Sequence, residues 1–228
     1  MKNLNSLVLA LGLIPFFHSQ ASNAKNIDIG DHNTSIPEYQ AGEVFIYSDR
    51  RVEWLHNIND NKIIWTTRKQ RPFVRDQNFV LPILEWQVGQ SRGQRNIFGN
   101  PEALWPLREG NSMRFRSVTE QTNLDNNKKR RSVEYWRCKV SDASDISIIA
   151  GTFFSYEISC DRYSPTSMNL LKRRIWYYSP AVGHYIKRKT INYFTGNIES
   201  YELVATLNGR NANPRRVNKI LSILRKSK

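Results

Sequence analysis

Few side chains in this sequence have the types and spacing that catalysis requires, and histidine is the clearest case. The chain has four histidines. Only His184, directly after Gly183 at the start of an expected strand, stands where a general acid or base could work with a neighbouring carboxylate. The alternative, which the surrounding residues favour, is a histidine packed among aromatic side chains. The sequence therefore predicts no catalytic residue, and an envelope hydrolase that uses His184 is kept as a hypothesis.

Motifs for metals, cofactors and nucleophiles are missing from the sequence. No His-x-His or Cys-x-x-Cys spacing offers a metal cage, and neither Gly-x-Ser-x-Gly nor a glycine-rich phosphate loop occurs. Glu53 and His56 are three residues apart, but on the strand expected there they point to opposite faces. We therefore expect no metal site and no cofactor.

Cationic and aromatic side chains are the residues that point to binding. The segment RIWYYSPAVGHYIKRK, residues 174–189, alternates aromatic residues around a Ser-Pro-Ala-Val-Gly turn between two basic clusters. Interleaved cations and rings can stack on sugars, and like charges on paired strands repel unless an anion lies between them. The candidate ligand-binding residues are Lys172, Arg173, Arg174, Trp176, Tyr178, His184, Tyr185, Lys187, Arg188 and Lys189. The alternative is that the rings are core residues and the charges are solvated at a sheet edge.

The two cysteines, Cys138 and Cys160, suit a disulfide. Period-two alternation places each thiol on the apolar face of its strand, and an even cysteine count in an exported chain favours pairing. The bond would be worth about 3 kcal/mol. A strand expected at 146–149 requires the two cysteines to meet beyond its end. Two free core thiols or a redox pair are the alternatives, although the close spacing of a redox pair is absent.

The N-terminus has the pattern of a signal peptide. Lys2 precedes an apolar run over 7–17, and small residues before position 25 fit a cleavage site, so we expect residues 1–24 to be removed. The run is too short to span a bilayer core, and no transmembrane segment is expected after cleavage. An uncleaved anchor is the alternative. The predicted location is the periplasm or the exterior.

The net charge of the chain indicates which classes of partner it attracts. At +14 the chain attracts polyanions, and export disfavours nucleic acid among them. The expected partners are an anionic lipid, an acidic polysaccharide or an envelope protein. A solvated basic surface is the alternative.

The elements that must position these residues are mainly strands. Residues 25–41 are polar and aperiodic, which predicts a flexible arm. The single domain expected over 42–228 has about ten antiparallel strands with turn residues at short spacing. Apolar runs with period-two patterns or turn-rich flanks place the strands at 43–48, 50–58, 62–68, 80–88, 112–121, 130–140, 146–149, 152–163, 170–179, 184–194 and 198–207. Residues 91–112 are expected to form a long connection, and 214–226 an amphipathic helix with a basic face.

Part of the chain resembles a group of exported bacterial proteins. The runs AGTFFSYEISCDRY at 150–163 and WYYSPAVGHYIKR at 176–188, followed by ELVA at 202–205, are similar to a pattern in β-rich exported proteins. Those proteins resemble the half-barrels of lipoprotein carriers, a curved antiparallel sheet with a helix across its mouth. The resemblance covers about a third of the chain. It implies a curved sheet and a cavity, and it transfers no catalytic residue.

Three functions follow as hypotheses. The first is a non-enzymatic envelope protein that binds an amphiphile or an acidic glycan on an aromatic, basic-rimmed concave sheet. The second is a structural or assembly factor that docks a partner or a membrane through its basic C-terminal helix. The third is the hydrolase with His184.

Overall fold

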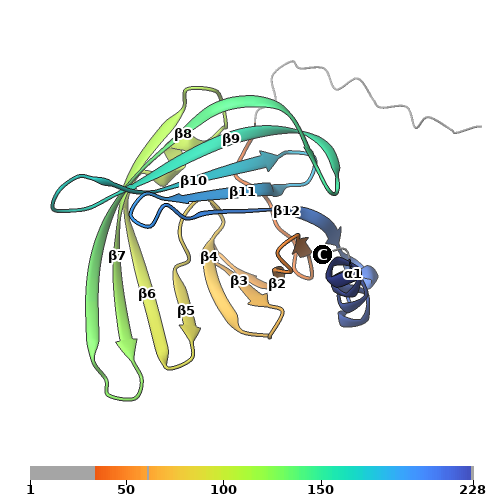
Figure 1. Ribbon diagram of the computed structural model, residues 1–228, viewed down its shortest axis with the longest axis horizontal. Coiled ribbons are helices and arrows are strands. Elements are labelled where there is room, and N and C mark those ends of the chain that lie inside the picture. The colour runs from red at the N-terminus through yellow and green to blue at the C-terminus, as the bar shows by residue number, and fades with distance from the viewer. Residues whose placement is uncertain (1–33, 61, 227–228) are drawn as a thin grey trace, which may run out of the picture. The chain divides into compact units, whose positions relative to one another are not determined.

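The computed structural model describes residues 34–60 and 62–226, and it is built from antiparallel strands and one C-terminal helix (Figure 1). The strands are β1 Val44–Tyr47, β2 Val52–Asn59, β3 Lys62–Thr67, β4 Pro72–Asp76, β5 Glu85–Val88, β6 Ser91–Gly99, β7 Ser112–Asn123, β8 Lys129–Ile148, β9 Gly151–Tyr163, β10 Leu170–Ser179, β11 His184–Asn192 and β12 Ile198–Leu207. Short 3-10 turns occupy Pro101–Leu104 and Gly209–Asn211, and helix α1 spans Pro214–Lys226.

The strands form a closed barrel in which each strand pairs with its neighbours in sequence. Closure comes from β1, where Val44 pairs with Leu207 of β12 on one side and with Trp54 of β2 on the other. The predicted fold class, a curved antiparallel sheet with a C-terminal helix, is confirmed. The barrel is closed where a half-barrel was expected, because β1 joins the first strands to the last.

The segment between 72 and 99 differs most from the sequence prediction. Residues 79–82 are not part of a strand; Phe79, Val80 and Leu81 are buried in the barrel core, and only β5 remains of the strand expected over 80–88. The long connection expected from residue 91 begins instead with strand β6. β6 is polar and lacks an apolar alternation, which is why its pattern did not predict a strand.

Two apolar clusters stabilise the fold. The larger fills the barrel interior and includes Trp65, Phe79, Leu104, Trp176 and Tyr185. The smaller lies between the outer face of the β1 region and α1, which buries Val217 and Leu221. The apolar side of the helix is therefore used to cover the sheet, and its basic side remains exposed.

Helix α1 begins at a well-formed cap. The side chain of Asn213 accepts a hydrogen bond from the backbone N–H of Arg216 at 3.0 Å, and Pro214 occupies the first helical position, where a missing N–H costs nothing. The helix ends with Arg225 and Lys226 in its last turn, where cations favour the helix dipole.

The chain before β1 packs against the domain from residue 34 onward. Tyr39 is only 8% exposed and belongs to the barrel core. Residues 34–41 therefore differ from the flexible arm expected over 25–41, because Tyr39 is fixed by ring contacts with Trp65 and His184. The predicted signal peptide at 1–24 and the remainder of the arm lie outside the described residues.

The predicted disulfide between Cys138 and Cys160 is confirmed. The two residues are direct cross-strand partners on β8 and β9. The separate strand expected at 146–149 is the end of β8, so no strand stands between the two cysteines.

Candidate functional site

The β10–β11 hairpin distributes the predicted ligand residues over two faces. Trp176 pairs with Arg188 and Arg174 pairs with Thr190, and alternation places Lys172, Arg174, Trp176 and Arg188 on the barrel interior. Tyr178, His184 and Tyr185 are also interior but are at most 4% exposed. A bulge between Tyr177 and Tyr178 shifts the register near the turn.

The remaining predicted residues, Arg173, Lys187 and Lys189, face outward. Arg173 donates two hydrogen bonds to Asp161 on β9, at 2.6 and 2.9 Å. Lys187 lies 3.9 Å from Glu202 on β12. The positive charges of Arg173 and Lys187 are therefore balanced by Asp161 and Glu202 on the neighbouring strands. The two predicted basic clusters do not form one continuous basic surface.

Four arginines meet inside the barrel. Arg75 of β4, Arg95 of β6, Arg174 of β10 and Arg188 of β11 line one cavity of about 250 Å³, together with Leu81, Pro82, Ile83, Trp86 and Trp176. A wider cleft of about 630 Å³ shares Arg75, Arg174 and Arg188 with it and reaches the β1–β2 and β3–β4 turns. The cavity therefore opens at the end of the barrel that carries these turns. We call the two hollows the arginine cavity.

Aromatic rings hold three of these guanidinium groups. Arg95 lies 4.9 Å from the centroid of the Trp86 ring, and Arg174 lies 5.1 Å from that of Trp136. Arg188 lies 5.0 Å from Trp176 and 4.6 Å from Tyr201. Such stacking fixes a guanidinium and leaves its N–H edge free to donate hydrogen bonds.

Trp86 reaches its place because β6 carries glycine at one position. Gly93 pairs with Trp86, and a Cβ atom at residue 93 would overlap the indole ring. The missing side chain lets the indole lie across β6 beside Arg95. A glycine in a polar strand is thus part of the site.

The charge of the arginine cavity is unbalanced. Arg75 pairs with Glu53 at 3.0 Å, whereas no ion pair joins Arg95, Arg174 or Arg188 to a carboxylate anywhere in residues 34–60 and 62–226. Burial, followed by repulsion from Arg188 and Arg95, lowers the pKa of Arg174 to about 9, and the charge of Glu134 opposes this shift only in part. The cavity is therefore a cluster of cations that an anion would stabilise.

Arg95 is positioned by neutral groups. Its Nε donates to the Thr119 hydroxyl at 3.0 Å, and its Nη1 donates to the carbonyl of Ile83 at 2.5 Å. Burial lowers its pKa. The backbone and a hydroxyl thus fix this arginine without cancelling its charge.

His184 belongs to a buried network beside the cavity. Its Nδ1 shares a hydrogen bond with the Tyr39 hydroxyl at 2.7 Å, and its Nε2 lies 3.5 Å from Glu53, too far for a strong hydrogen bond. Tyr185 donates to the same carboxylate at 2.8 Å. Burial raises the pKa of Glu53, but Arg75, His184 and Tyr185 lower it by more, so the carboxylate stays ionised.

The histidine itself has no route to a substrate. Its side chain is 0% exposed and lies among the rings of Tyr39, Phe45, Trp65 and Phe79. Burial, against the opposing effect of Glu53, lowers the pKa of His184, which keeps the imidazole neutral. This geometry gives the hydrolase hypothesis no support, because a general acid or base must touch the reacting group.

Sequence reasoning missed part of this site. Glu53 was considered only as a neighbour of His56, and Arg75, Trp86 and Arg95 were not singled out. Alternation in RPFVRDQ (71–77) puts Phe73 and Arg75 on one face, which is a usable signal. Arg95 fell in the expected loop, and no local signal placed it near β10.

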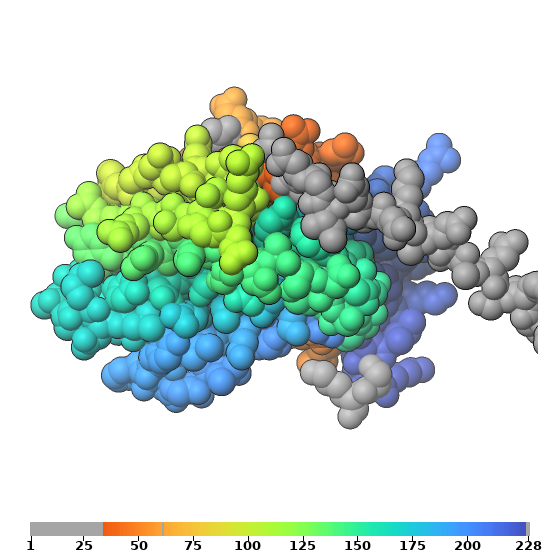
Figure 2. Space-filling view, turned by 90° about the horizontal axis from the view of Figure 1, so that it is seen from above, coloured from red at the N-terminus to blue at the C-terminus, as the bar shows by residue number. Residues whose placement is uncertain are grey.

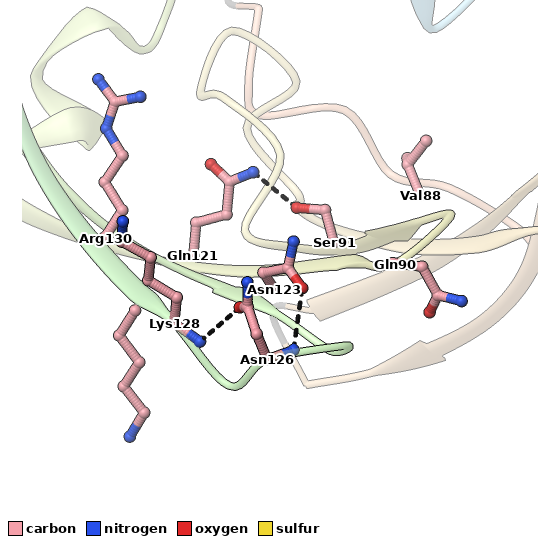
Figure 3. Close-up of a pocket in the computed structure, with 9 residues that line it drawn as sticks. Val88, Gln90, Ser91, Gln121, Asn123, Asn126, Lys128 and Arg130 are labelled. Atoms are coloured by element: carbon pink, nitrogen blue, oxygen red, sulfur yellow. Dashed lines mark hydrogen bonds between the residues drawn. The ribbon is translucent and has the colours of Figure 1, made fainter.

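A second hollow lies at the tips of the β5–β6 and β7–β8 hairpins. It has about 480 Å³ and is lined mainly by polar side chains, including Gln90, Asn126, Lys128 and Arg130. Figure 3 shows Gln121 donating to Ser91 across it, at 2.6 Å. Its side chains are exposed or half-buried, so it is a groove between turns, distinct from the arginine cavity.

Among the residues that the structure describes, no group of three or more His, Cys, Asp or Glu side chains could hold a metal ion. Within the same part of the chain, no helix has the length and apolar character needed to cross a membrane.

Comparison with known proteins gives distant structural neighbours only. No family model and no curated protein matches the chain. The hypothetical lipoprotein YmcC from Escherichia coli is 9% identical, with a TM-score of 0.48, and the match covers 72% of this chain and 82% of that one. A Bacteroides fragilis protein described as exported, with a YmcC-like fold, is 10% identical with a TM-score of 0.41, covering 77% and 100%.

A third neighbour, a Parabacteroides distasonis protein described as a lipoprotein, is 11% identical with a TM-score of 0.37, covering 78% and 100%. All three are bacterial proteins described as lipoproteins or exported proteins. The barrel assignment rests on the strand pairing of this chain.

Proposed function

We propose that this protein is an exported, non-enzymatic envelope protein that binds an acidic ligand in the arginine cavity. The observation that supports the proposal is the set of three half-buried arginines, Arg95, Arg174 and Arg188, that stack on rings and have no ion-pair partner in residues 34–60 and 62–226. Cations that are partly withdrawn from water and unpaired are costly, and an anion would reduce that cost. The ligand therefore carries a phosphate, sulfate or carboxylate group.

The rings act mainly as supports for the arginines in this proposal. Trp176 is 1% exposed and is contacted by Arg188, Phe79 and Tyr185. It has no free face for a sugar, so the stacking role expected for it from the sequence is replaced by holding Arg188. Recognition would then depend on charge and hydrogen bonding more than on apolar contact.

The smaller, inner hollow of the arginine cavity limits which part of a ligand can enter it. A volume of about 250 Å³ suits an acidic head group or a single acidic sugar, while drug-sized ligands need about 300–1,000 Å³. The rest of the ligand would extend through the wider cleft to the β1–β2 and β3–β4 turns. Both an acidic amphiphile and an acidic glycan fit this description, and they share the anionic group.

Calorimetric titration tests the proposal with defined probes. Monododecyl phosphate represents the amphiphile and tetragalacturonate the glycan; dodecyl maltoside and maltotetraose are their uncharged counterparts. We expect one acidic probe to bind and its uncharged counterpart not to bind. Arg174→Gln/Arg188→Gln should weaken binding about tenfold or more, because each hydrogen bond to a charged group is worth about 1.5–3 kcal/mol.

The matched control removes two arginines from the outer face of β7. Arg114 and Arg116 are exposed, and Arg114→Gln/Arg116→Gln should leave affinity unchanged. Equal binding of charged and uncharged probes, or equal losses in both double variants, would contradict the proposal.

Helix α1 gives less support to the assembly hypothesis. Its apolar residues Val217 and Leu221 are buried against the barrel, so they are not available to enter a membrane. Its exposed surface is mainly basic and includes Ile223, which is 58% exposed.

A further inference from the structure

The end of the barrel where the arginine cavity opens carries six hairpin turns. In this meander the β1–β2, β3–β4, β5–β6, β7–β8, β9–β10 and β11–β12 turns all lie at one end. The β5–β6 and β7–β8 turns are joined by a backbone hydrogen bond from Leu124 to Gln90 at 2.8 Å, and Tyr193 of the β11–β12 turn donates to Leu171 of β10 at 3.0 Å. We call this region the hairpin end. Figures 1 and 2 place the β9–β10 and β11–β12 tips on the side away from α1.

Large apolar side chains are exposed at the hairpin end. Phe194, in the β11–β12 turn, is 88% exposed, and its neighbours Tyr193 and Ile198 are 47% and 62% exposed. Met168 in the β9–β10 turn is 60% exposed, and Val88 at the β5–β6 turn is 58% exposed. An aromatic side chain at the tip of a turn contributes nothing to the core, so contact with an apolar phase would give it a role.

Basic side chains occur at other turns of the same end. The β3–β4 and β7–β8 turns and their flanks contribute Arg68, Lys69, Arg71, Lys128, Lys129 and Arg131, and Figure 3 shows Lys128 at the β7–β8 turn. Fewer acidic residues occur at or beside the six turns of the hairpin end: Asp49, which pairs with Arg51 at 3.2 Å, Asp125 and Glu199. The opposite end of the barrel carries Asp60, Asp76, Glu85, Glu102, Asp142 and Asp145. That end also carries the basic side of α1, which follows β12 there, so cations occur at both ends of the barrel. The cavity mouth opens among the basic β1–β2 and β3–β4 turns.

We infer that the hairpin end docks on the surface of an anionic phospholipid bilayer. Phe194 and Tyr193 enter the interfacial layer, and the lysines and arginines of the β3–β4 and β7–β8 turns contact lipid phosphates. The mouth of the arginine cavity then faces the lipid head groups. This inference goes beyond the proposed function and does not require the cavity to be occupied, because the docking residues are outside it or at its rim.

Vesicle flotation tests the inference with the full exported protein. Vesicles of phosphatidylglycerol and phosphatidylcholine should bind the protein, and vesicles of phosphatidylcholine alone should not. Phe194→Ser/Tyr193→Ser should weaken binding about tenfold. Lys128→Gln/Lys129→Gln/Arg131→Gln should weaken it by about tenfold or more, since each basic residue near such a surface contributes several-fold.

Matched controls separate the hairpin end from other surfaces. Ile149, which is 57% exposed at the opposite end, is the apolar control as Ile149→Ser. Arg114→Gln/Arg116→Gln/Arg137→Gln removes the same charge from the outer face of β7 and β8. Both variants should bind like the wild type.

Three results would overturn the inference: no binding by the wild type, unchanged binding by the two hairpin-end variants, or equal losses in the controls. The double variant Arg174→Gln/Arg188→Gln measures how much the cavity alone contributes to vesicle binding. If it alone lost vesicle binding, a head group would enter the cavity without docking of the turns, and the inference would be wrong while the proposed function stood.

Discussion

Replacing Arg174 with glutamine should stabilise the ligand-free protein. The guanidinium of Arg174 is enclosed with Arg188 and Arg95, and burial and their charges lower its pKa from 12.5 to about 9. At about 1.4 kcal/mol per pKa unit, the penalty for keeping this group charged at neutral pH has a ceiling of about 5 kcal/mol. Water in the cavity screens part of it, and the variant loses a contact with Trp136 worth about 1 kcal/mol.

The expected net gain is therefore about 1–2 kcal/mol in the free energy of unfolding. For a chain of this size it corresponds to a rise of about 2–8 °C in the melting temperature. Arg75→Gln is the matched comparison, because Arg75 pairs with Glu53. Its loss should be destabilising, since a buried carboxylate is left without its cation.

The assay is thermal unfolding in dilute buffer without phosphate or sulfate. In a second scan, added sulfate should raise the melting temperature of the wild type, because a ligand that binds only the folded state stabilises it. The same addition should raise the melting temperature of Arg174→Gln by less. If Arg174→Gln lowered the melting temperature as Arg75→Gln does, Arg174 would be a structural residue and the reasoning would be refuted.

Three further predictions concern the buried network and the disulfide. Glu53→Gln should cost about 3–5 kcal/mol of stability because Arg75 loses its partner, and adding Arg75→Met should recover part of this loss in denaturant titration. The folded-state pKa of His184 is lowered, so the neutral imidazole contributes its full stability above the unfolded-state pKa of about 6.5, and this contribution is lost as the pH falls below that value toward the folded-state pKa. His184→Gln should flatten this part of a pH–stability profile, and an unchanged profile would contradict the assignment. Cys138→Ala/Cys160→Ala should cost about 3 kcal/mol, and a reductant should lower the wild-type melting temperature without changing that of the variant.

Local patterns predicted the elements whose signals lie within one segment. Period-two alternation and the turn residues at 179–183 predicted the β10–β11 hairpin. Helical spacing of apolar residues predicted α1, and the positions of the two thiols on apolar strand faces predicted the disulfide. Barrel closure was not predictable in this way, because β1 and β12 are more than 150 residues apart and their pairing has no local signature.

The candidate site was predictable only in part for the same reason. Arg174 and Arg188 were singled out from the sequence and line the cavity, while their role in binding stays a prediction. Tyr178 and Tyr185 are core residues here because Phe79, from the segment before β5, enters the barrel and packs against both rings. No strand pattern indicates that a connecting segment fills the interior.

A crystallographic soak with selenate tests the central claim most directly, because the anomalous signal of selenium locates the anion without prior assumptions. The account predicts the strongest peak inside the arginine cavity, within hydrogen-bonding distance of Arg174 and Arg188. An empty cavity with selenate bound only at exposed lysines of the hairpin end would contradict it.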